Sequence, residues 1–96
     1  MGKLNETALA AAVDGLPGWR VENGKLHREY TFPDFVHAFG FMATAAIAIE
    51  SMEHHPEWSN VWNRVVVDLT THDAGGITAK DILLAEKLEE LAKRLQ

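Results

Sequence analysis

The chain has 96 residues, 47% of them hydrophobic, and its 14 acidic and 9 basic side chains give a formal net charge of -5. This composition predicts one small domain covering residues 1–96, and the acidic balance without any basic run argues against a nucleic-acid backbone or an anionic membrane as ligand. Cysteine is absent, which excludes disulfides, thiolate metal sites and cysteine nucleophiles and suits a reducing compartment.

The first third of the chain predicts a short helix followed by a hairpin. Asn5 is a suitable N-cap, and Gly15 and Pro17 end the helical pattern. From Trp19 to Phe32 apolar and polar residues alternate on either side of Asn23-Gly24. Because Asn-Gly between alternating runs is the strongest local hairpin signal, we expect two antiparallel strands here.

A long helix is predicted next. Pro33-Asp34 suits a first helical turn, and we expect the helix to end near His55, because Pro56 disfavours helical geometry in the residue before it. Its apolar window, 35–49, is too short and too mixed in composition for a bilayer core. No signal peptide is expected at the N-terminus.

The last third predicts two more strands and a helix. Strands are expected over Trp58 to Trp62 and Val65 to Thr71, with a turn at Asn63-Arg64. Thr78 and Asp81 match a capping box for the final helix. The order helix, two strands, helix, two strands, helix predicts an α+β domain whose antiparallel sheet carries helices on one face.

Three histidines and one glutamate are the candidates for chemistry. On the long helix Glu50 and His54 are four residues apart with side chains close enough to touch, so we expect the carboxylate to orient the imidazole and favour its protonated form. His55 points about 100° away from His54 on that helix, so we expect the two rings to have different functions, one binding and the other transferring protons. His72 ends an extended run before a glycine loop, where functional side chains are common.

Plainer interpretations and a metal site stay open at this point. A Glu–His pair on a helix is commonly a solvated surface contact, Trp58 suits packing, and Asp81 suits the capping box alone. Glu50, His54 and His72 would also give three ligands for a catalytic zinc. No HExxH pattern accompanies them, so a metal-free acid–base site is favoured.

The sequence resembles the pterin-4a-carbinolamine dehydratase family. The resemblance is carried by 50–58 (ESMEHHPEW), 60–63 (NVWN) and 71–81 (THDAGGITAKD), and it extends over nearly the whole chain. It implies a four-stranded antiparallel sheet in the order α-β-β-α-β-β-α. The implied reaction removes water from 4a-hydroxytetrahydropterin to give quinonoid dihydropterin, which recycles the cofactor of aromatic amino-acid hydroxylases.

The resemblance also implies residue roles and partners. The catalytic glutamate falls on Glu50 and the three histidines on His54, His55 and His72, and we expect His54 and His72 to transfer protons while His55, Trp58 and Asp81 bind the pterin. No metal or organic cofactor is implied. We expect a cytoplasmic homodimer or homotetramer that binds a pterin, with no direct nucleic-acid or membrane partner. The alternative is a non-catalytic coactivator or assembly factor on the same fold.

Overall fold

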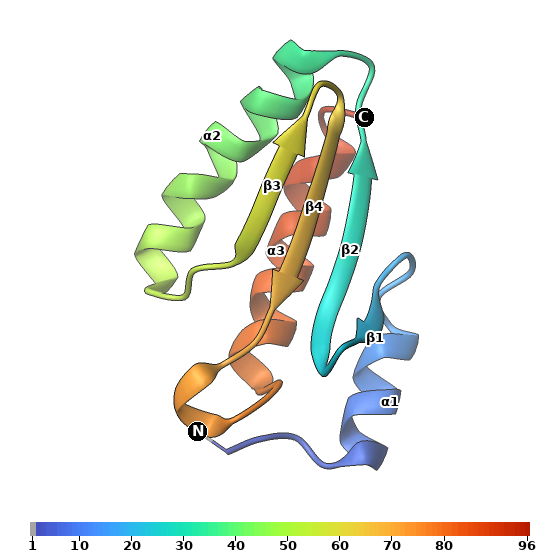
Figure 1. The fold of residues 1–96 in the computed structure, drawn as a ribbon, viewed down its shortest axis with the longest axis vertical. Helices are drawn as coiled ribbons and strands as arrows, with labels where there is room; N and C mark the ends of the chain where they lie inside the picture. Colours follow the sequence, from blue (N-terminus) through green and yellow to red (C-terminus); the bar gives the residue numbers. More distant parts are fainter. Residues whose placement is uncertain (1) are drawn as a thin grey trace.

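The computed structural model describes residues 2–96, as three helices and a four-stranded sheet (Figure 1). In chain order the elements are α1 (Glu6–Asp14), β1 (Arg20–Glu22), β2 (Lys25–Thr31), α2 (Phe35–Met52), β3 (Glu57–Val61), β4 (Arg64–Leu69) and α3 (Ala79–Lys93), with one turn of 3₁₀ helix (His72–Ala74) after β4. The predicted order of elements and the α+β class are therefore confirmed.

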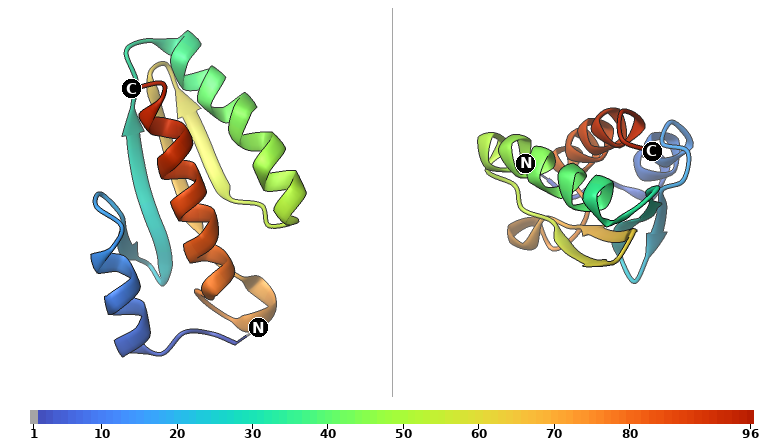
Figure 2. Two further views of the ribbon diagram at one scale, coloured as in Figure 1. Left: turned by 180° about the vertical axis from the view of Figure 1, so that it is seen from behind. Right: turned by 90° about the horizontal axis from the view of Figure 1, so that it is seen from above.

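All neighbouring strands are antiparallel, in the order β1-β2-β4-β3. The helices cover one face of this sheet and leave the other face open (Figure 2). The first hairpin turns at Asn23-Gly24 as predicted, with φ values of 53° and 75°. Both residue types accept this left-handed backbone more readily than others do, which explains the turn's position.

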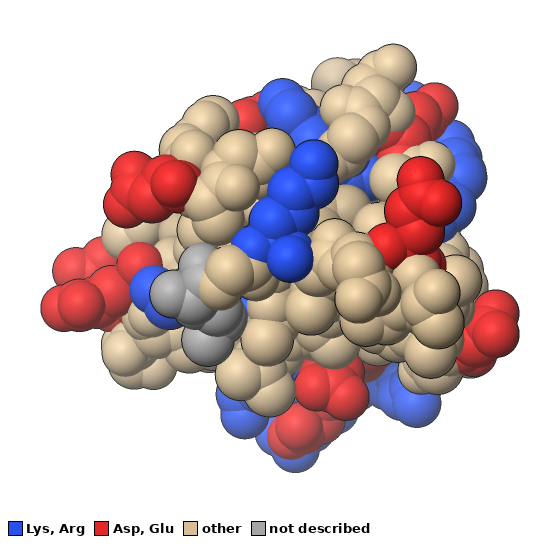
Figure 3. Space-filling view, turned by 90° about the horizontal axis from the view of Figure 1, so that it is seen from below, with Lys and Arg blue, Asp and Glu red and all other residues tan. Residues whose placement is uncertain are grey.

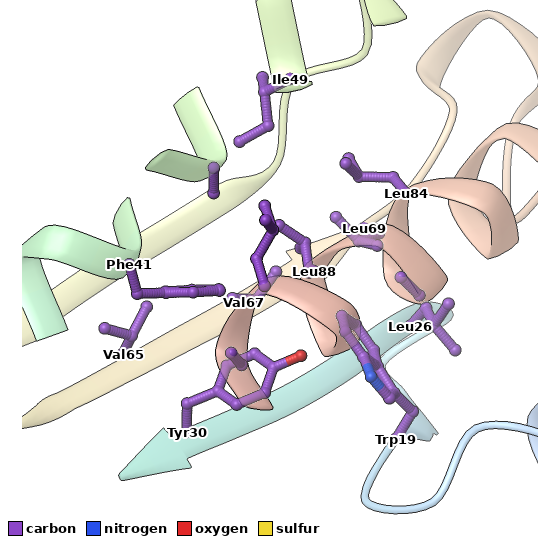
Figure 4. Packing of buried hydrophobic residues seen from close by; sticks show 14 of the residues in the cluster. Trp19, Leu26, Tyr30, Phe41, Ile49, Val65, Val67, Leu69, Leu84 and Leu88 are labelled. Carbon is purple, nitrogen blue, oxygen red and sulfur yellow. The ribbon is translucent and has the colours of Figure 1, made fainter. Parts of the chain in front are cut away.

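The core lies between the sheet and the helices. Tyr30 and Phe41 are fully buried with ring centroids 5.1 Å apart, and Leu84 and Leu88 of α3 pack into the same layer (Figure 4). The apolar side of α3 thus faces the core. Asn5 accepts a hydrogen bond from the backbone N–H of Ala8 and caps α1, as predicted.

The predicted end of the long helix was wrong. α2 ends at Met52, and Glu53 adopts a left-handed conformation with φ 53°. The N–H of Glu53 bonds to the carbonyl of Glu50, and the N–H of His54 bonds to that of Ile49. This is the Schellman pattern, with glutamate where glycine is usual. His54 and His55 therefore belong to the connection to β3.

The second hairpin is confirmed, but its predicted turn at Asn63-Arg64 was one residue late. β3 ends at Val61 and β4 begins at Arg64, so that Trp62 and Asn63 form the turn. Trp62 takes the left-handed φ of 50°, a conformation that its side chain disfavours and that the sequence therefore did not predict. β4 also ends at Leu69, and Thr71 instead bridges to Gly76 across the following loop.

Candidate active site

The three candidate histidines line one hollow at an end of the sheet. α2 and β4 both finish at this end, and α3 begins there (Figure 1). The hollow has a volume of about 260 Å³, and its lining residues are Glu53, His54, His55, Thr70, Thr71, His72, Asp73 and Lys80. Side chains of both signs lie at this end of the molecule (Figure 3). Residues from three separate segments of the chain thus meet around one concave surface.

His54 is buried and is held by Asp81. Its Nε2 lies 2.5 Å from Oδ1 of Asp81, a carboxylate with no exposed surface. The other carboxylate oxygen, Oδ2, accepts hydrogen bonds from the hydroxyl of Thr71 and the backbone N–H of Thr78, each at 2.8 Å. With those donors on Oδ2, Oδ1 is free to accept the Nε2 proton of His54. Asp81 therefore completes the capping box and also fixes the ring.

The predicted contact between Glu50 and His54 is not formed. Glu50 Oε1 lies 3.0 Å from Nε2 of His55 instead. The physical reason is the early end of α2, because His54 leaves the helical path at the left-handed Glu53 and turns inward to Asp81. Both members of the Glu50–His55 pair are exposed, by 79% and 65%. Glu50 therefore contacts a lining residue but is not itself part of the lining.

His72 lies in the 3₁₀ turn after β4, and its side chain is 80% exposed. Its Nε2 is 3.4 Å from Oε2 of Glu57, the first residue of β3. The sequence predicted His72 as a site residue but gave Glu57 no function. Glu57 stands next to the His-His-Pro segment, and that proximity is the only signal that pointed to it.

The three rings share one pattern, in which each approaches a separate carboxylate through Nε2. No hydrogen bond to Nδ1 of any of them occurs within residues 2–96. For His54 this atom also retains contact with solvent, because no buried side-chain nitrogen or oxygen in that part of the chain lacks a partner. Binding at one ring nitrogen orients an imidazole and leaves the other nitrogen for proton transfer.

The structure separates the remaining candidates. Trp58 lies on the helix-facing side of β3, partly buried against the core, and is not in the hollow's lining. The proposed zinc set does not form, since within residues 2–96 no three His, Asp or Glu side chains converge in a way that suits a metal ion. Asp81 lies behind His54 rather than at the surface of the hollow.

A second histidine cluster was missed by the sequence analysis. His27 on the open face of the sheet is 7% exposed, and its two ring nitrogens lie 2.7 Å from Asp68 and 2.9 Å from Glu29. Burial of the ring opposes its protonation, but the hydrogen bonds to Glu29 and Asp68 outweigh burial and raise the pKa of His27 above 6.5. The alternation of side chains along β2 and β4 places His27 and Asp68 on the same face of the sheet. That they stand opposite each other depends on the register of β2 with β4, which the sequence alone does not give.

Comparison with known proteins decides the family. The model of the pterin 4 alpha carbinolamine dehydratase family matches residues 2–91. The chain belongs to this family. A relative from Solibacter usitatus, named as a candidate pterin-4-alpha-carbinolamine dehydratase, is 62% identical over 90 residues, which are 94% of this chain and 95% of the relative. One from Rhizorhabdus wittichii with the same name is 50% identical over 94% of this chain and 95% of its own length.

The fold of the family is also that of this chain. A crystal structure from Brucella melitensis, described as a transcriptional coactivator/pterin dehydratase, superimposes with a TM-score of 0.91. It is 43% identical in sequence, and the match covers 95% of this chain and 99% of the other. The four-stranded antiparallel sheet with helices on one face is therefore shared with a solved family structure.

Proposed function

We propose that this chain is a hydro-lyase that dehydrates 4a-hydroxytetrahydropterin to quinonoid dihydropterin by metal-free acid–base catalysis. One observation carries the proposal: His54, His55 and His72 surround a single hollow, and each approaches its own carboxylate through Nε2. Family membership and the names of the relatives support the same reaction.

The elimination needs two proton transfers. The hydroxyl on C4a leaves as water only after it gains a proton, and a ring proton of the substrate must depart to form the product. His54, oriented by Asp81, and His72 act as the acid–base pair, while His55, held by Glu50, binds the pterin. No electron transfer or nucleophile is required. The reaction balances as one substrate giving one product and one water, and in this proposal the histidine side chains alone carry out the proton transfers.

The test is a direct assay of the reaction. The ultraviolet absorbance change is followed after 4a-hydroxytetrahydropterin is generated, with wild-type protein, buffer alone and wild-type protein treated with a chelator. We expect the protein to exceed the spontaneous rate and the chelator to have no effect. A rate equal to that of buffer would show that the chain is not this dehydratase, and loss of activity on chelation would show that catalysis depends on a metal.

We propose further that the chain forms a homo-oligomer through α2. On the side away from the core this helix exposes Val36 (74%), Phe39 (56%) and Ile47 (75%), and the ring of Phe39 lies 5.8 Å from that of Phe35. α2 is also apolar enough to cross a bilayer by length and composition alone, with a mean hydropathy of 1.4. However, Ala38, Phe41, Ala45 and Ile49 bury its other side in the core. Burial of the exposed stripe against a second copy removes a large apolar surface from water.

Sedimentation of wild type and of Phe39→Asp tests this assembly. We expect a dimer or tetramer for wild type and a smaller species for Phe39→Asp, whereas a wild-type monomer would contradict the proposal.

The assembled protein acts in the cytoplasm, where it recycles the cofactor of an aromatic amino-acid hydroxylase. The name of the Brucella melitensis structure includes a coactivator, and an inactive wild type that copurifies with another protein would favour that binding function instead.

A further inference from the structure

His72 has less support from the fold than the other two rings. His54 is buried and bound to Asp81, but the side chain of His72 is 80% exposed and stands on a single 3₁₀ turn. Of the charged groups in residues 2–96, only Glu57 lies within ion-pair distance of the ring, at 3.4 Å. Glu53, Asp73 and Lys80 line the same hollow, but none of these is in ion-pair contact with His72. A proton-transferring ring that is this exposed needs something to hold it.

Glu57 is itself fixed from two directions. It begins β3, where it pairs with Asp68 of β4. Its Oε1 binds the Nζ of Lys25, at the start of β2, while its Oε2 is the atom that approaches His72. The hydrogen bond to Lys25 is the main reason that the pKa of Glu57 is lowered, so the group is a carboxylate that accepts hydrogen bonds at neutral pH. Lys25, Glu57 and His72 thus form a chain from the sheet to the hollow.

We propose that Glu57 is a positioning residue for His72 and that Lys25 holds Glu57 in place. The inference rests on the proposed function, to which it adds the third carboxylate–imidazole pair. By accepting the Nε2 proton, Glu57 orients the ring and leaves Nδ1 for proton exchange with the substrate. This is the arrangement that Asp81 gives His54. The difference is that the pair lies at the surface, where water weakens ionic contacts, so its effect on the rate is modest.

A double-mutant cycle tests whether Glu57 acts through His72. We expect Glu57→Ala to lower kcat about threefold with little change in KM, since the contact orients a reacting group rather than the bound substrate. In a His72→Ala background the same substitution should have no further effect. Lys25→Met should lower kcat by a smaller factor, and Glu90→Ala, which removes an exposed carboxylate on α3, should change nothing. An equal loss from Glu57→Ala in both backgrounds would overturn the proposal.

A measurement that does not use activity separates this inference from the proposed function. Carbon-13 relaxation of the His72 ring reports how freely the ring moves. We expect the ring of His72 to become more mobile in Glu57→Ala and in Lys25→Met, while the ring of His54 is unchanged. Unaltered mobility of His72 would overturn the positioning role even if the wild type is active. If the wild type proves inactive but Glu57→Ala still makes the ring of His72 more mobile, the positioning role is upheld and only the dehydratase proposal is rejected.

Discussion

Two regions of the molecule each combine imidazole and carboxylate groups, but these groups have different functions in the two regions. On the open face of the sheet, each ring nitrogen of His27 contacts a carboxylate: Nδ1 contacts Asp68, and Nε2 contacts Glu29. A third carboxylate, that of Glu22, also lies 3.2 Å from Nε2. At the hollow, His54 is equally buried, but only its Nε2 is bound, to Asp81. Both rings are held by acids, and they differ in how many nitrogens remain free.

The difference separates a structural histidine from a reactive one. Carboxylates only accept hydrogen bonds, so both nitrogens of His27 must donate, and the ring is a protonated link between strands with nothing left for a ligand. His54 keeps one nitrogen for proton exchange, as do His55 and His72. On burial and acidic neighbours alone, His27 would qualify as a reactive histidine as well as His54 does. The free nitrogen and the adjoining hollow identify the other three.

The largest effect is expected from His54→Gln, with the other buried histidine, His27, as the matched control. His54→Gln removes the proton-transferring ring, and kcat/KM should fall by about 10²- to 10⁴-fold. His27→Gln should leave kcat/KM within about twofold, because the ring is not part of the lining of the hollow. Steady-state kinetics of both variants measures the contrast. Equal losses in the two variants would remove the distinction between the regions.

Asp81→Asn should affect both activity and stability. The carboxylate is fully buried and accepts hydrogen bonds from Thr71, Thr78 and His54. An amide in its place offers a donor where acceptors are needed, so we expect a loss of about 1–3 kcal/mol in the free energy of unfolding. kcat should also fall by at least about tenfold, because His54 loses its orientation. Urea unfolding and kinetics on one preparation provide both values.

A matched control tells whether the stability lost in Asp81→Asn comes from the hydrogen bonds of Asp81 or from substituting any residue near the hollow. Thr70→Ala, in the lining of the hollow but in none of these hydrogen bonds, is the matched control for unfolding. If Asp81→Asn unfolds at the same urea concentration as wild type, Asp81 is not the anchor of His54.

The order of elements was predictable because its signals are local. Asn23-Gly24, Pro33-Asp34 and the Thr78–Asp81 box act within a few residues, and each is where the structure requires it. The end of α2 was not predictable, because Glu53 adopts a left-handed backbone that glutamate rarely takes. That single residue decides which carboxylate meets which histidine. The sequence thus pointed to the three histidines that line the hollow, but their pairing with carboxylates depends on tertiary structure.

Each of the two buried histidines has a partner that lies far from it in the chain. Asp81 is 27 residues from His54, and Asp68 is 41 residues from His27. Periodicity places a residue on a face of its own element, but it does not say which residue of another strand or helix stands opposite. The capping box even gave Asp81 a sufficient local explanation. Its second function, holding His54, depends on the end of α2, which turns His54 toward α3.

A smaller effect is expected from pH acting on the His27 cluster. The pKa of His27 is raised, so its contribution to stability is complete below 6.5 and is lost as pH rises through the raised value. Hydrogen bonds from His27 and Arg64 lower the pKa of Glu29 from 4.5 to about 2, so its contribution is complete above 4.5 and is lost as pH falls toward 2. The two contributions are therefore complete together between pH 4.5 and 6.5.

Urea unfolding of wild type and His27→Gln across this range measures the effect. We expect wild type to be more stable by about 1 kcal/mol between pH 4.5 and 6.5, with the difference shrinking at higher pH. A difference that stays constant from pH 5 to pH 9 would show that the ring is not protonated in the folded state. His27 would then have a free nitrogen after all, and its contrast with His54 would be lost.

The smallest effect is expected at Glu50. The family resemblance assigns it a catalytic role, yet its side chain is 79% exposed, and its one hydrogen-bond partner among residues 2–96 is His55, at 3.0 Å. If its function is to hold a ring that binds the pterin, Glu50→Gln should raise KM by no more than about threefold and leave kcat unchanged. A tenfold fall in kcat with constant KM would mean that Glu50 meets the substrate itself, and that the hollow extends beyond the residues that line it in the single chain.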